Sequence, residues 1–102
     1  MSGMMGGMSA YWINFFLEVP DQERLEAYAE LATPAIAAAG GRFLARGMPA
    51  LVFERGRETR TVIIEFPSVE AAAACYDSPA YQESLAALGE AARDIRVVPG
   101  VE

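Results

Sequence analysis

The chain of 102 residues is 53% hydrophobic and carries a formal net charge of −6 at pH 7. This length suits one compact domain with little room for an internal cavity, and the acidic charge argues against nucleic acid or an anionic membrane surface as a partner. The chain has no His and no Lys, so it lacks the commonest general base and metal ligand and cannot form a Schiff base. We therefore expect neither a metal site nor a cofactor.

The start of the chain bears on where the protein resides. Met1–Ser9 is rich in Met and Gly and lacks the basic region of a secretory signal. No apolar run approaches the roughly 20 residues that cross a bilayer. We expect Met1–Ser9 to be a flexible leader, residues 10–102 to form a single domain, and the protein to be cytoplasmic.

The first expected strand, Ala10–Val19, is rich in aromatic and β-branched residues. Alternation along it separates two sets, Tyr11, Ile13, Phe15 and Leu17 on one face and Trp12, Asn14, Phe16 and Glu18 on the other. The first set is wholly apolar, so we expect it to pack on helices. The second set still carries Trp12 and Phe16, which so few helices cannot also cover. We therefore expect a second copy of the sheet to cover that face.

An amphipathic helix is expected over Gln22–Leu31, with Asp21 as its N-cap. Its inner stripe consists of Leu25, Tyr28, Ala29 and Ala32. Thr33-Pro34 is expected to interrupt this helix and to start a second helical piece that runs to Ala39. Gly40-Gly41 would end that piece in a left-handed cap.

The middle of the chain predicts a hairpin. The strand Arg42–Gly47 is expected to place Phe43 and Ala45 on one face and Arg42, Leu44 and Arg46 on the other. After a bend at Met48-Pro49, the strand is expected to continue over Leu51–Glu54. Arg55-Gly56-Arg57 then turns the chain into Arg60–Phe66.

The second half completes a split βαβ pattern. Pro67 ends the strand Thr61–Phe66, and Ser68 caps a helix over Val69–Tyr76. Ser78 and Pro79 start a further helix, roughly Pro79–Ala92, and Asp94–Val98 is the last strand. The order β-α-β-β-α-β is ferredoxin-like. We therefore expect an α+β fold with an antiparallel sheet and helices on one face.

Three motifs in this order carry a family resemblance: G-G-R-F-L-A-R-G at Gly40–Gly47, I-E-F-P-S-V-E-A-A at Ile64–Ala72 and Y-D-S-P-A-Y-Q at Tyr76–Gln82. They resemble the domain-of-unknown-function 1330 family (DUF1330), over most of the chain after the leader. Members are small ferredoxin-like proteins similar to the dimeric α/β-barrel group, in which two subunits place their sheets face to face. The resemblance implies a homodimer but no function. Cys75 and Met48 stand where the family usually has Trp and Gly, so no ligand is carried over.

The candidate chemical groups are polar residues expected on the second sheet face. Glu65 shares a face with Thr61 and Ile63 and is expected beside Asn14. A buried carboxylate needs a partner, and Arg46 offers a planar fork of donors. A Glu65–Arg46 ion pair would either fix the register of the dimer or line a small-molecule pocket.

Aromatic and thiol side chains on the helices form a second group of candidates. Tyr28, Tyr76 and Tyr81 are expected to bury their rings in the core, with hydroxyls that could also bond a carbonyl or carboxylate ligand. Without a His to activate it, Cys75 is expected to act as a small hydrophobe and not as a nucleophile.

Three hypotheses for function follow. The leading one is an uncharacterised homodimer that binds a small organic ligand between sheet and helices, with Asn14, Tyr28, Arg46, Glu65 and Tyr81 as contacts. An alternative is a cofactor-independent enzyme similar to the monooxygenases and isomerases of the dimeric α/β-barrel group. In that enzyme Glu65 would be the base and Arg46 the anion clamp. The third is a purely structural dimer without a ligand.

Overall fold

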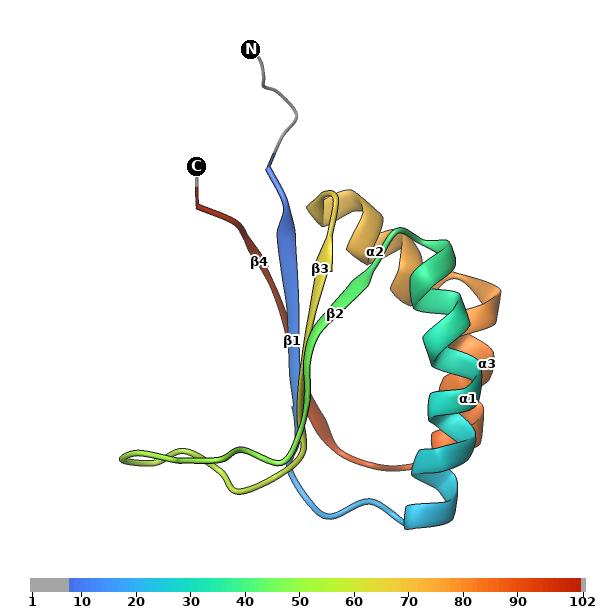
Figure 1. The fold of residues 1–102 in the computed structure, drawn as a ribbon. Coiled ribbons are helices and arrows are strands. Elements are labelled where there is room, and N and C mark those ends of the chain that lie inside the picture. Colours follow the sequence, from blue (N-terminus) through green and yellow to red (C-terminus); the bar gives the residue numbers. More distant parts are fainter. Residues whose placement is uncertain (1–7, 102) are drawn as a thin grey trace.

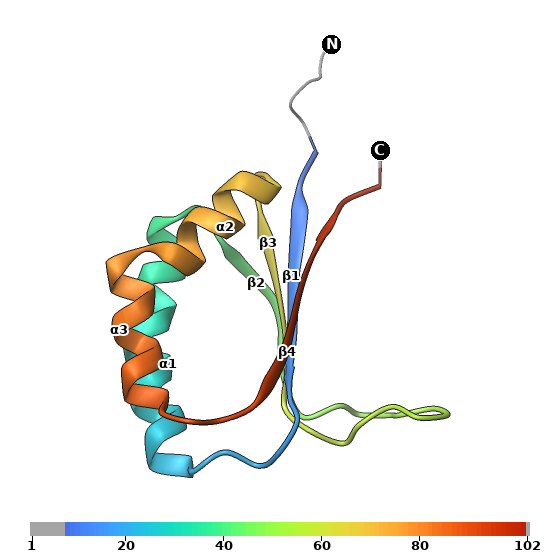
Figure 2. The ribbon, with the colours of Figure 1, turned by 180° about the vertical axis from the view of Figure 1, so that it is seen from behind.

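The computed structural model describes residues 8–101, a range with seven helices and strands. In chain order they are β1 (Ala10–Phe16), α1 (Gln22–Ala38), β2 (Arg42–Gly47), β3 (Thr61–Phe66), α2 (Val69–Asp77), α3 (Pro79–Leu88) and β4 (Arg93–Pro99). The strands form one antiparallel sheet in the order β2-β3-β1-β4. The helices lie together on one face of this sheet, and the other face is open (Figures 1 and 2). The predicted ferredoxin-like α+β fold is confirmed; Met1–Gly7 of the expected leader lie outside the described residues.

The helix starts follow local sequence signals. The side chains of Asp21, Ser68 and Ser78 each accept a hydrogen bond from a backbone N–H in the first turn of α1, α2 and α3. All three N-caps were predicted from the sequence, because a short polar side chain satisfies a backbone donor that the helix itself leaves free.

The lengths of two helices differ from the prediction. The expected break at Thr33-Pro34 is wrong, because α1 is continuous and contains Pro34. Pro34 is exposed, whereas Ala35 and Ile36 beside it are buried, so packing offsets the hydrogen bond that proline cannot make. The last helix ends at Leu88 and not near Ala92, since Gly89, with φ of 78°, adopts a conformation that ends a helix.

The faces of β1 are the reverse of the prediction. Trp12 and Phe16, 1% and 2% exposed, lie under the helices, whereas the partly exposed set of Tyr11, Ile13 and Phe15 faces the open side. The Trp12 ring packs against Phe66, Tyr76 and Tyr81, with ring centroids 5.4 to 5.9 Å apart. Alternation sorts residues into two sets but cannot tell which set meets the helices. The chain's own helices therefore cover the face that was expected to need a second copy.

A bulge in β2 also changes which residues share a face. Phe43 pairs with Ile64 and Ala45 with Ile63, so Leu44 is an extra residue in the strand. Phe43 and Arg46 both lie on the covered face. This contradicts the prediction that Phe43 shares a face with Ala45 and that Arg46 shares the other face with Arg42. Strict alternation fails here because it does not hold across a bulge.

The connection between β2 and β3, residues 48–60, is a projecting loop without ladder pairing. The predicted strand over Leu51–Glu54 is therefore wrong; Pro49, close to its start, cannot donate a ladder hydrogen bond. The loop turns where the N–H of Gly56 donates to the Phe53 carbonyl oxygen at 2.9 Å. We call residues 48–60 the β2–β3 arm; it extends from the sheet on the side opposite the helices (Figures 1 and 2).

The core lies between the covered face of the sheet and the helices. Its largest fully buried members include Trp12, Tyr81, Phe66 and Ile36. Cys75 of α2 is 1% exposed and belongs to this core, where burial raises the pKa of its thiol. Within residues 8–101, none of the helices combines the length and the apolar character needed to cross a membrane.

Candidate functional site

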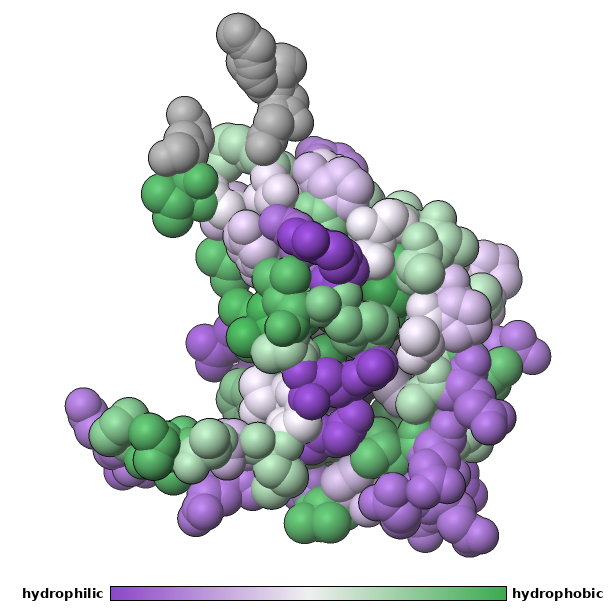
Figure 3. Space-filling view, in the orientation of Figure 1, coloured by the Kyte–Doolittle hydropathy of each residue, from purple (hydrophilic) through white to green (hydrophobic). Residues whose placement is uncertain are grey.

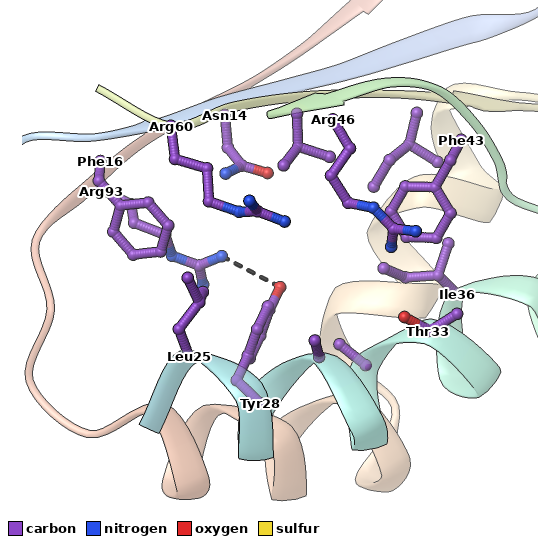
Figure 4. A pocket seen from close by; sticks show the side chains of 14 residues that line it. Asn14, Phe16, Leu25, Tyr28, Thr33, Ile36, Phe43, Arg46, Arg60 and Arg93 are labelled. Carbon is purple, nitrogen blue, oxygen red and sulfur yellow. Dashed lines mark hydrogen bonds between the residues drawn. The ribbon is translucent and has the colours of Figure 1, made fainter. Parts of the chain in front are cut away.

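A narrow pocket lies between the covered face of the sheet and α1 (Figure 4). The inner stripe of α1 forms one wall of the pocket. Side chains from all four strands, together with the residue just before β3, form the other wall. The pocket is lined by Asn14, Phe16, Leu25, Tyr28, Ala29, Ala32, Thr33, Ile36, Phe43, Arg46, Arg60, Val62, Ile64 and Arg93. Its enclosed volume of about 30 Å³ holds about two water molecules. A larger ligand therefore has to displace the long arginine side chains that occupy the space.

Three arginines from different segments converge on this pocket. Arg46 comes from β2, Arg60 directly precedes β3, and Arg93 is the first residue of β4. In Figure 4 the Arg60 guanidinium lies above Tyr28 and Arg93 bonds to the Tyr28 hydroxyl, whereas the Arg46 guanidinium lies beside the Phe43 ring, 4.2 Å from its centroid. None of the lining residues is Asp or Glu. The pocket thus gathers three positive charges without a carboxylate in its wall.

The end of β1 positions two of these arginines. The Phe16 N–H donates to the Arg60 carbonyl oxygen at 3.2 Å, and the Leu17 N–H donates to the Ala92 carbonyl oxygen at 2.9 Å. These two bonds continue the pairing of β1 with β3 and with β4. They therefore fix the backbone next to Arg60 and Arg93 on either side of the same strand.

Two tyrosine hydroxyls hold the Arg93 guanidinium. Its Nη1 lies 3.2 Å from Tyr28 Oη and 3.3 Å from Tyr81 Oη, and donates to both. The two hydroxyl oxygens are 2.8 Å apart, so one phenol also donates to the other. Burial raises the pKa of Tyr81 well above its ordinary value, so this phenol stays neutral. Arg93 therefore keeps its full positive charge beside neutral partners.

Asn14 adds a neutral donor to the pocket. Its side chain is buried, and its Oδ1 accepts a hydrogen bond from Trp12 Nε1 at 2.9 Å. Because an indole N–H can only donate, this bond fixes the orientation of the amide. No described residue accepts a hydrogen bond from the Asn14 amide nitrogen. The amide and the three guanidinium groups therefore all offer donors, a pattern that suits the oxygens of a carboxylate or another anion.

The pocket includes three of the five residues predicted to contact a ligand, namely Asn14, Tyr28 and Arg46. Tyr81 lies behind Tyr28 and bonds to its hydroxyl. Glu65 does not join them. It lies on the open face, where its carboxylate accepts hydrogen bonds from Arg42 Nη2 at 2.7 Å and from the Tyr11 hydroxyl at 3.2 Å.

The predicted Glu65–Arg46 ion pair is therefore wrong, because the bulge in β2 sends Arg46 to the covered face and leaves Arg42 opposite Glu65. The Arg42 guanidinium, through its hydrogen bond, lowers the pKa of Glu65 below its ordinary value. A carboxylate with a lowered pKa is a weaker base. The enzyme hypothesis, with Glu65 as base and Arg46 as clamp, consequently places its two residues on opposite faces of the sheet.

Arg60 and Arg93 were missed by the sequence prediction, although alternation carries a signal for both. Arg60 is in phase with Val62 and Ile64, which are buried on the covered face. Arg93 is likewise in phase with Ile95, which packs against the core. Applying the alternation to Arg60, at the start of the expected segment Arg60–Phe66, and extending the last strand by one residue would have placed both arginines on the helix side. The residues 8–101 contain no group of three or more His, Cys, Asp or Glu that could hold a metal ion.

The sequence matches the family model described as "Domain of unknown function (DUF1330)" over residues 9–101. No curated protein matches it in sequence. The family match therefore covers nearly the whole chain.

Solved structures similar to this one share the fold at low sequence identity. A protein of unknown function from Rhodopseudomonas palustris is 17% identical with a TM-score of 0.73, covering 94% of this chain and 85% of its own. A dimeric ferredoxin-like protein of unknown function from Thermobifida fusca is 20% identical with a TM-score of 0.62, covering 99% and 97%. SnoaB, a cofactor-independent oxygenase from Streptomyces nogalater, is 14% identical with a TM-score of 0.55, covering 94% and 93%. These similarities show a common fold.

Proposed function

The chain belongs to the DUF1330 family, whose name assigns no activity, and we propose that it binds a small organic anion in the pocket between the sheet and α1. The observation that carries this proposal is the convergence of Arg46, Arg60 and Arg93 on a space with no carboxylate in its wall. Like charges in a partly dehydrated space repel each other and lose hydration. A bound anion would remove both costs, and each guanidinium can bond a carboxylate through two parallel hydrogen bonds.

The rest of the wall favours an anion with an apolar body over an inorganic ion. Phe16, Ile36, Val62 and Ile64 provide apolar surface next to the arginines. Burial of a hydrocarbon group against this surface is favourable, whereas a phosphate or sulfate ion has no apolar part to bury there. We therefore propose a monocarboxylate with an aromatic or short aliphatic body, whose head meets the guanidinium groups.

The proposal includes a homodimer formed through the open sheet face. Tyr11, Ile13, Phe15 and Ile63 leave apolar surface partly exposed there, and a second copy of the same face would cover it. The Thermobifida fusca protein with this fold is described as dimeric. Light scattering at micromolar concentration tests this part, and a mass equal to the 11.0 kDa chain would refute it.

We do not extend the proposal to catalysis. SnoaB is described as a cofactor-independent oxygenase, but what it shares with this chain is the fold, and fold does not determine function. The lining residues of this pocket include no carboxylate and no imidazole that could act as a base.

Calorimetric titration with benzoate, hexanoate, phosphate and the neutral analogue benzamide tests the anion proposal. We expect benzoate or hexanoate to bind and to raise the melting temperature, phosphate to bind more weakly, and benzamide not to bind. Arg60→Met should weaken carboxylate binding by about 10- to 100-fold, since a hydrogen bond to a charged group contributes about 1.5–3 kcal/mol. Arg55→Met is the matched control, because Arg55 is exposed on the β2–β3 arm. Equal affinities for both variants, or no binding of any anion at millimolar concentration, would overturn the proposal.

A further inference from the structure

The β2–β3 arm exposes more apolar surface than any other loop of the described chain. Leu51 and Phe53 are 75% and 74% exposed, and Met48 is 66% exposed. These side chains follow one another along a single projecting segment, visible as the hydrophobic run at the lower left of Figure 3. Scattered apolar residues on a surface are ordinary, but a contiguous group of this kind marks an interaction site.

We infer that the arm of each subunit packs Leu51 and Phe53 against a second copy of this chain. This inference rests on the homodimer proposed above and names a part of its interface. The arm leaves the sheet on the side opposite the helices (Figures 1 and 2). A copy stacked on the open face would occupy the same side, so the arm would extend along it.

The area of the open face supports a role for the arm. Four strands spaced about 4.8 Å apart, with about six residues each at roughly 3.3 Å per residue, give a face of roughly 400 Å². A stable interface of standard size buries about 800 Å² on each partner. The accessible surface of the side chains on the face exceeds this flat outline, and the 13-residue arm is the adjacent segment that enlarges it toward the standard size.

Charge and symmetry fit a second copy as the occupant. The tip of the arm carries Glu54 and Glu58 together with Arg55 and Arg57, so it has no net charge. With Arg60 at its end, the whole arm carries three Arg and two Glu, a net charge of +1. It therefore does not repel the acidic body of an identical chain, whereas a negatively charged arm would. In a two-fold dimer each subunit gives one arm and receives one, so the apolar surface of both arms is covered.

The test is the mass of a Leu51→Ser/Phe53→Ser variant by light scattering over a concentration series. We expect its dimer dissociation constant to rise at least 100-fold relative to the unaltered chain. Leu31→Ser/Val69→Ser is the matched control, because these partly exposed residues lie on α1 and α2, on the helix side. It should leave the dissociation constant unchanged within about 3-fold.

Hydrogen exchange on the unaltered chain provides a second measurement that needs no variant. Backbone amides of residues 51–57 should exchange more slowly at concentrations where the dimer forms than in dilute solution. If the arm variant dimerises like the control and these amides stay unprotected, the arm inference is overturned while the homodimer stands. If the unaltered chain is a monomer throughout, both are overturned. Benzoate titration of the same samples reports on the anion site separately.

Discussion

Arginine side chains have different surroundings on the two faces of the sheet. On the open face, Arg42 pairs with Glu65 at 2.7 Å and Arg96 pairs with Asp94 at 3.0 Å. On the covered face, Arg46, Arg60 and Arg93 line a pocket without any carboxylate. The open face is therefore internally neutralised, whereas the covered face holds uncompensated positive charge.

This difference indicates what each face is suited to meet. Paired charges between apolar side chains can be covered by another protein surface at little electrostatic cost, because each ion already has its partner. Converging guanidinium groups that have only neutral partners are suited to an anionic ligand instead. The overall charge of −6 does not indicate such a basic pocket, because the pocket depends on where individual charged residues lie.

The largest expected effect concerns packing on the covered face. Trp12→Ala should lower the free energy of unfolding by about 3–5 kcal/mol, because the buried indole packs on three other rings. Ile13→Ala, one residue along on the open face, should cost only about 1 kcal/mol in the monomer, since Ile13 is partly exposed there. Urea denaturation in dilute solution measures both. Equal losses would contradict the assignment of the two faces.

The next effect separates the paired from the unpaired arginines. Arg93→Met should weaken benzoate binding by about 10- to 100-fold, because it removes a charged donor from the pocket. Without ligand, the free energy of unfolding should change little, since removing an uncompensated cation offsets the loss of its hydrogen bonds to the Tyr28 and Tyr81 hydroxyls. Calorimetry and urea denaturation give the two quantities.

The matched control for this comparison is Arg96→Met on the same strand. Its exposed ion pair with Asp94 is expected to contribute little to stability and nothing to anion binding. A loss of benzoate affinity as large as that of Arg93→Met would show that general charge, and not the pocket, attracts the anion.

Much of the fold could be predicted from short-range signals. The caps Asp21, Ser68 and Ser78 and the strand Thr61–Phe66 are local features, because a polar side chain before a helix and an apolar alternation act within a few residues. The βαββαβ order followed from these signals alone.

The orientation of the strands could not be predicted in the same way. Whether Trp12 or Ile13 meets the helices depends on how the whole sheet is placed under them, which alternation does not encode. The bulge at Leu44 reversed the rest of β2 and moved Arg46 away from Glu65. As a result, Asn14, Tyr28 and Arg46 of the predicted contacts line the pocket and Glu65 does not, whereas the prediction did not include the lining residues Arg60 and Arg93.

A smaller effect distinguishes the roles of the two tyrosines that bond to Arg93. Tyr81→Phe removes a fully buried hydroxyl and should lower the free energy of unfolding by about 1 kcal/mol, with benzoate affinity changed less than about 2-fold. Tyr28→Phe removes a hydroxyl that lines the pocket and should also weaken benzoate binding by roughly 5-fold, equivalent to about 1 kcal/mol. Paired calorimetric and denaturation measurements distinguish the two. The same loss of affinity in both variants would mean that Tyr28 acts only through Arg93.

The smallest effect is a pH dependence confined to the open face. The hydrogen bond from Arg42 lowers the pKa of Glu65, and the hydrogen bond from Arg96 lowers the pKa of Asp94. A carboxyl with a lowered pKa in the folded state stabilises the fold above its unfolded pKa, which is about 4. That contribution is lost as the pH falls through the folded value. The melting temperature should therefore fall between about pH 4.5 and pH 3, and Glu65→Gln should reduce this fall.

Glu30→Gln is the control for this last prediction, because Glu30 is an exposed residue of α1 that changes the net charge by the same amount. Its melting curves should keep the acid dependence of the unaltered chain, since the two open-face ion pairs remain intact. If Glu65→Gln and Glu30→Gln gave the same dependence, general charge repulsion in acid would explain it. The neutralisation of the open face by its ion pairs would then have no measurable part in stability, and the contrast between the two faces would depend on the pocket arginines alone.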